Sequence, residues 1–167
     1  MGFERVSVEK LTATIIGITI LVIAAGGVIR IYDAGESCPD WPTCFGTWGF
    51  DISEEEQKEW FDENPSEIDS RGSSHTYTSF QIFTEWIHRL LAGAILGPLV
   101  ILNWLIIRKD EELTNEVKLA SMISILLIGW QGFLGYVTVR LDNLHWSVAL
   151  HLASALLFLM SLVWIWL

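Results

Sequence analysis

Four long apolar stretches constrain the fold of this 167-residue chain more than any other feature of its sequence. They cover residues 11–29, 83–107, 119–139 and 146–167. Each is close to the roughly 20 apolar residues that an α-helix needs to cross a bilayer. Because a chain in lipid must satisfy its own backbone polar groups, such stretches form helices. The sequence therefore predicts an all-α integral membrane protein, a four-transmembrane-helix bundle forming one domain over residues 1–167.

The positive residues indicate how this bundle lies in the cell membrane. Arg5 and Lys10 precede the first stretch, and Arg108, Lys109 and Lys118 lie between the second and third. Positive charge on short loops marks the cytoplasmic side of a membrane protein. We therefore expect a multi-pass protein with both termini cytoplasmic. The long loop at residues 31–82 and the short turn between the third and fourth stretches are then extracytoplasmic.

The long loop accounts for the entire net charge of −10. Between Asp33 and His75 there are 12 acidic residues and 2 basic ones. This charge would repel nucleic acid phosphates, so nucleic acid is not an expected partner. Three interpretations stay open: a solvated face, a docking surface for a basic partner, or an adaptation to high salt. Within the loop, residues 54–61 predict a short helix capped by Ser53, with acidic residues in its first turn.

Two histidines, His88 and His151, lie inside apolar stretches near the outer end of their helices. The two helices run in the same direction, so the two imidazoles are expected at matched depth. An ionisable side chain inside a membrane is a functional candidate by default. Two imidazoles can ligate one haem iron from opposite faces, whereas a closed zinc site usually needs four ligands. The alternative is a pair of buried histidines that hydrogen-bond to their neighbours.

Charged residues accompany these histidines. Glu85 lies three positions before His88 and therefore shares its helix face. It can take part in proton chemistry, or it can be a structural partner for an arginine. Arg30, Arg89 and Arg140 stand at the outer ends of three helices. They either reach to the membrane interface as separate side chains or form a cluster that binds haem propionates.

The third apolar stretch carries a small-residue face and one amide. Gly129, Gly132 and Gly135 are spaced by three, which would admit a flat macrocycle or allow close helix packing. Gln131 on the same helix is a candidate polar contact to a cofactor or substrate.

Cys38 and Cys44 lie six positions apart at the start of the long loop. An oxidising compartment favours a disulfide bond between them, and a redox-active thiol pair is the other interpretation. His75 and His145 are predicted to be loop residues and not axial ligands.

The motifs taken together resemble the haem A synthase family. The resemblance rests on the segments GGVIR (26–30), SCPDWPTCFG (37–46), EWIHR (85–89), QGFLGYVTV (131–139) and VALHL (148–152). It implies an enzyme that oxidises the C8 methyl of haem O to a formyl group, giving haem A for terminal oxidases. It also implies that His88 and His151 are axial ligands, that Glu85 assists the oxidation, and that Cys38 and Cys44 lie over the site.

The resemblance is to the compact, half-size archaeal form of the family, with one histidine pair where most members have two. A second haem site, such as a haem B site, would then need a second protomer in a homo-oligomer. The expected partners are haem O, a separate electron donor, and the haem O synthase or terminal oxidase. Two other classes stay open: a non-catalytic membrane cytochrome b with two histidine ligands, and a membrane thiol-disulfide oxidoreductase.

Overall fold

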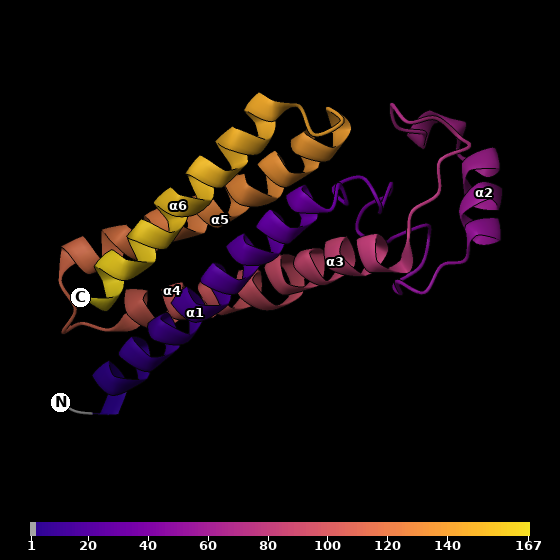
Figure 1. The fold of residues 1–167 in the computed structure, drawn as a ribbon. Coiled ribbons are helices and arrows are strands. Elements are labelled where there is room, and N and C mark those ends of the chain that lie inside the picture. Colours follow the sequence, from indigo (N-terminus) through magenta and orange to yellow (C-terminus); the bar gives the residue numbers. More distant parts are fainter. Residues whose placement is uncertain (1–2) are drawn as a thin grey trace.

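The fold is an all-helical bundle with a folded lobe at one end (Figure 1). The computed structural model describes the backbone of residues 3–167 and the side chains from residue 8 onward, so the side chain of Arg5 lies outside the described residues. Its elements are α1 (Phe3–Ile31), α2 (Glu54–Glu63), η1 (Pro65–Glu67), α3 (Ser79–Arg89), η2 (Leu90–Leu96), α4 (Gly97–Lys109), α5 (Asn115–Arg140) and α6 (His145–Trp166).

Four helical segments in the described part of the chain are long and apolar enough to cross a membrane. They are Val8–Ile31, Ser79–Lys109, Asn115–Arg140 and His145–Trp166. The four-helix prediction is therefore confirmed, and each span extends beyond its predicted limits at one end or both. Helix caps account for two of these extensions: Thr78 caps α3 together with Gln81, and Thr114 caps α5.

The second span is interrupted by a wide helical turn that the apolar pattern did not predict. Residues Leu90–Leu96 form a π-helix, and the Gly97 amide donates to the carbonyl of Ala92, five residues earlier. Pro98 explains this turn, because proline has no amide hydrogen and its ring clashes with the carbonyl four residues before it. Single π-turns of this kind are frequent at functional sites, and this one directly follows His88 and Arg89.

The spans pack in a ring. Helix α1 packs against α6 and against the α3–η2–α4 span, while α5 packs against α4 and α6. The two spans that carry His88 and His151 therefore stand at opposite corners of the ring. In Figure 1, α1 begins and α6 ends at the same end of the bundle, the termini end, and α2 lies at the other end, the loop end.

The lobe at the loop end has a core of its own. The buried apolar residues of this core are Cys38, Cys44, Phe45, Ile52, Phe61, Tyr77 and Ile82. Helix α2 forms as predicted, with a capping box between Ser53 and Glu56. The segment after it contains the short helix η1. The long loop is therefore a packed structure that sits on the end of α3.

Candidate functional site

His88 is held in one orientation by helix α1. Its Nδ1 atom lies 3.1 Å from the main-chain carbonyl oxygen of Val22. A carbonyl can only accept, so the proton of the neutral imidazole is on Nδ1 and the lone pair is on Nε2. Gly26 lies beside this ring, because a Cβ at that position would make ordinary van der Waals contact with His88 Cε1, at 3.5 Å. The result is a ring whose Nε2 is prepared to act as a ligand.

His151 also lies beside a glycine, but its Nδ1 atom makes no hydrogen bond to the described residues. A Cβ at Gly135 would lie 3.7 Å from His151 Cε1, so this ring also faces a glycine on the adjacent helix. Its Nδ1 atom is buried and has no hydrogen-bond partner among the described residues.

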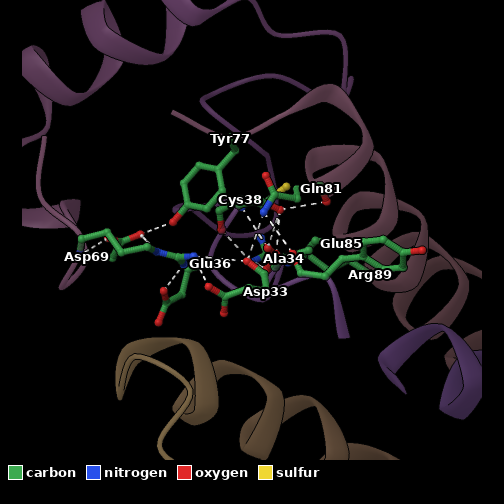
Figure 2. A network of polar contacts seen from close by, with 12 residues as sticks. Asp33, Ala34, Glu36, Cys38, Asp69, Tyr77, Gln81, Glu85 and Arg89 are labelled. Carbon is green, nitrogen blue, oxygen red and sulfur yellow. Dashed lines mark hydrogen bonds and ion pairs between the residues drawn. The ribbon is translucent and has the colours of Figure 1, made fainter. Parts of the chain in front are cut away.

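Glu85 is a buried carboxylate with every oxygen engaged (Figure 2). Its Oε2 atom accepts from the hydroxyl of Ser37 and from the amide of Cys38, both at 3.0 Å. Its Oε1 atom forms an ion pair with Arg89, one helical turn further along α3. The carboxylate thus joins the membrane-spanning helix to the first residues of the lobe.

Arg89 completes this junction. Its terminal nitrogens donate to the carbonyls of Cys38 and Asp40 at 2.6 Å each and to that of Thr43 at 3.4 Å, besides pairing with Glu85. Both of its terminal nitrogens are therefore used by the protein itself. Arg89 fixes the loop of residues 38–44 over the end of α3.

The other two arginines occupy different surroundings. Arg30 is exposed at the end of α1, and Arg140 pairs with Glu67 at 2.8 Å and lies 6.0 Å from the Tyr136 ring centroid. Within the described residues, no ion pair or hydrogen bond links Arg30, Arg89 and Arg140 to one another. The structure does not bring the three together as one cluster, so each must be considered separately as a propionate partner.

The predicted disulfide between Cys38 and Cys44 is confirmed. Both residues are at most 1% exposed and pack in the core of the lobe. A bond so enclosed is poorly placed for exchange with other thiols, which favours the structural interpretation over the redox-active one.

A second polar network supports the lobe, and its members were not singled out in the sequence. Arg71 pairs with Asp33 at 3.1 Å, with Glu36, and with Asp69 at 3.6 Å, while the Tyr77 hydroxyl donates to Asp69 (Figure 2). Burial raises the pKa of the Glu36 carboxyl, although Arg71 acts in the opposite direction. Burial and the bond to Asp69 likewise raise the pKa of Tyr77. The network joins the end of α1 to residues far along the loop.

The remaining candidates divide between the inside and the surface of the bundle. Gln131 has a buried Nε2 atom without a partner among the described residues, whereas Gly129 and Gly132 are exposed, with open space beside them. His75 packs edge-on against Tyr77 in the lobe. His145 is the first residue of α6, not a loop residue as expected, and it is exposed.

The donor set fits a haem better than a metal ion bound by the protein alone. No group of three or more His, Cys, Asp or Glu side chains with metal-site geometry occurs in the described part of the chain. Two imidazoles from opposite corners of the ring, one with a prepared Nε2 and one with an unpartnered Nδ1, are instead suited to a haem between them.

The family model for cytochrome oxidase assembly proteins named COX15-CtaA matches residues 9–167. The chain belongs to this family. It is a multi-pass membrane protein, as the four apolar helices and this family indicate. The archaeal assignment is not tested by the match and stays a prediction.

Curated relatives agree with this membership. A heme A synthase of Shewanella oneidensis is 34% identical over 134 residues, covering 80% of this chain and 37% of the relative. A heme A synthase of Erythrobacter litoralis is 27% identical over 166 residues, covering 89% and 47%. A heme A synthase-mitochondrial ferredoxin fusion protein of Schizosaccharomyces pombe is 26% identical over 183 residues, covering 96% and 29%. The chain thus spans less than half the length of these relatives, and no solved structure matches it.

Proposed function

We propose that this chain is a haem A synthase that oxidises the C8 methyl of haem O to a formyl group by successive oxygenations. The observation that carries the proposal is the arrangement of His88 and His151 beside the buried Glu85–Arg89 ion pair. The relatives named heme A synthase support it, although the chain covers less than half of their length.

In this proposal His88 and His151 would hold a haem between α3 and α6. The bound haem supplies the redox-active iron. The exposed Arg30 is free of ion pairs within the described residues and is the best propionate partner, with Arg140 second, since Arg140 already holds Glu67. Arg89 contributes indirectly, because its donors hold the loop.

Glu85 is the proton-handling group of the proposal. The hydroxyl of Ser37 has a single hydrogen but three acceptors around it: the Ala34 carbonyl at 2.7 Å, the Gln81 carbonyl at 2.9 Å and Glu85 Oε2 at 3.0 Å. When Oε2 carries a proton, the hydroxyl can turn toward a carbonyl and accept that proton's hydrogen bond. Glu85 can therefore gain or lose a proton without leaving a buried polar atom unsatisfied.

The same proposal implies which proteins supply the substrate and electrons and which protein receives the product. Haem O arrives from the haem O synthase, and haem A leaves for a terminal oxidase. Electrons come from a separate donor of the ferredoxin class, a proposal supported by the ferredoxin fused to the Schizosaccharomyces pombe relative. In this proposal both termini lie in the cytoplasm and the lobe lies outside, which the positive residues on the short loops support. A second copy of the chain would supply a further haem site, such as one for haem B.

Expression of the chain in cells that make haem O tests the proposal. Extracted haems are analysed by mass, with the same cells lacking the chain as control. We expect a formyl haem only where the chain is present. Unmodified haem on the purified chain, with oxygen and reductant supplied, would instead identify a non-catalytic cytochrome b.

A further inference from the structure

Two buried hydroxyl groups on the helix pair that carries His151 lack the bond that seven other helical hydroxyls in the described residues make. Thr14, Thr19, Thr84, Ser121, Ser124, Ser147 and Ser161 each donate to a carbonyl three or four residues earlier. Thr138 and Ser154 are 7% and 5% exposed, yet their hydroxyl oxygens have no partner among the described residues. Both lie on the helix pair that carries His151.

The register of α5 against α6 places a third unpartnered group opposite Ser154. The Ser124 and Ser161 hydroxyls lie 2.8 Å apart, and a Cβ at Gly135 would contact His151. In an antiparallel pair with this register, Gln131 lies level with Ser154. The Nε2 atom of Gln131 is also buried and unpartnered. The two donors therefore share one level, one helical turn from His151 toward the termini end.

The parts of α5 and α6 around Gln131 and Ser154 carry no charged side chains. Helix α5 has no charged residue between Lys118 and Arg140, and α6 has no acidic or basic residue besides its two histidines. Unsatisfied amide and hydroxyl donors inside a membrane protein are costly, so they favour a ligand that brings an acceptor. Without a nearby cation, a carboxylate is disfavoured. A neutral oxygen, such as that of a carbonyl or hydroxyl group, fits.

We propose that Gln131 and Ser154 form a subsite for the oxygen atom placed on the haem substituent, as hydroxymethyl and then as formyl. The inference rests on the proposed function, since it assumes a haem ligated by His151. A methyl group offers no acceptor to these donors. The Gln131–Ser154 subsite would therefore recognise the oxidised substituent and hold the half-oxidised haem until oxidation to the formyl is complete.

Binding of haem A and haem O to the purified full-length chain tests the subsite without any turnover. The two haems differ at this substituent only by formyl in place of methyl. We expect Gln131→Leu and Ser154→Ala each to weaken haem A binding about tenfold, the equivalent of one hydrogen bond, and to leave haem O binding unchanged. Ser154→Thr keeps the hydroxyl and should restore haem A binding. Ser161→Ala, a matched serine further along the same helix pair, should change neither affinity.

Three outcomes would overturn the inference. If the variants lost affinity for haem A and haem O equally, Gln131 and Ser154 would instead stabilise the fold or bind water. Unchanged affinities for both haems would show that the donors do not meet the formyl oxygen. Failure of the unaltered chain to bind either haem would refute the proposed function together with the subsite, which separates that failure from the other two.

Discussion

The Nδ1 atom of His88 lies 3.1 Å from the carbonyl oxygen of Val22, a hydrogen bond between two membrane-spanning helices. It fixes both the tautomer and the direction of the imidazole before any ligand arrives. The Nδ1 atom of His151 has no such bond within the part of the chain that the structure describes. The two histidines proposed to hold the haem are therefore unequal: the His88 ring is fixed by this bond, whereas the His151 ring could still turn to meet a haem.

This inequality predicts different behaviour in two histidine variants. His151→Gly should lose low-spin haem and regain it when free imidazole is added, because only a loosely held ring has to be replaced. His88→Gly should lose the haem and recover little of it with imidazole, because free imidazole must be positioned by the Val22 carbonyl without a tether to α3. Absorption spectra of the purified variants, titrated with imidazole, measure both responses. Equal rescue of the two variants would contradict the inequality.

Replacing Glu85 should separate binding from oxidation. Glu85→Gln removes the charge while keeping the shape of the side chain, so the chain should still bind haem O through His88 and His151. Formation of formyl haem should stop or fall steeply, because the proton-handling atom has been lost. Mass analysis of the haem retained by the purified variant gives the answer. Haem A in the usual amount would remove Glu85 from its proposed role.

Replacing Arg89 should loosen the loop over the site. Lysine has one terminal nitrogen and cannot reach the carbonyls of Cys38, Asp40 and Thr43 while also pairing with Glu85. The loop of residues 38–44 would then lose some of the hydrogen bonds that hold it, so Arg89→Lys should expose the disulfide to reductant.

Thiol labelling after mild reduction measures this exposure. The chain has no free cysteine, so any label reports an opened Cys38–Cys44 bond. Lys58→Arg, on an exposed position of α2, is the matched control and should label as slowly as the unaltered chain. Slow labelling of Arg89→Lys would mean that other contacts hold the loop.

Glu36 should make the stability of the protein fall as the pH rises. Burial raises the pKa of its carboxyl in the folded state above its ordinary value of about 4.5, so the folded state binds a proton more tightly than the unfolded state. The free energy of unfolding therefore decreases through the interval between those two pKa values. Glu36→Gln removes this contribution and should flatten the slope from about pH 4.5 upward. Thermal unfolding of the unaltered chain and of Glu36→Gln across this pH interval tests the prediction. If the two proteins show the same change of stability with pH, Glu36 is not its source.

Local sequence signals sufficed for much of the architecture. The four spans follow from apolar length, and the α2 helix follows from its Ser53 cap and acidic first turn. The disulfide follows from two cysteines six positions apart in the long loop. Each depends on residues close together in the chain. The pairing of Glu85 with Arg89 could likewise be predicted from the sequence, because residues four apart on a helix are neighbours.

Long-range contacts were not predictable in the same way. Arg89 meets carbonyls 46 to 51 positions earlier, and Arg71 meets carboxylates 35 and 38 positions earlier. Nothing in the local pattern separates such arginines from side chains that reach to the interface. The order of the four spans around the ring also depends on contacts between distant residues, so the sequence did not predict it.

Electron paramagnetic resonance of the purified ferric protein tests most directly whether His88 and His151 hold one haem between them. The account predicts a low-spin signal typical of two imidazole ligands, and its loss when either histidine is replaced by alanine. A high-spin signal in the unaltered chain, or a low-spin signal that survives both replacements, would contradict it.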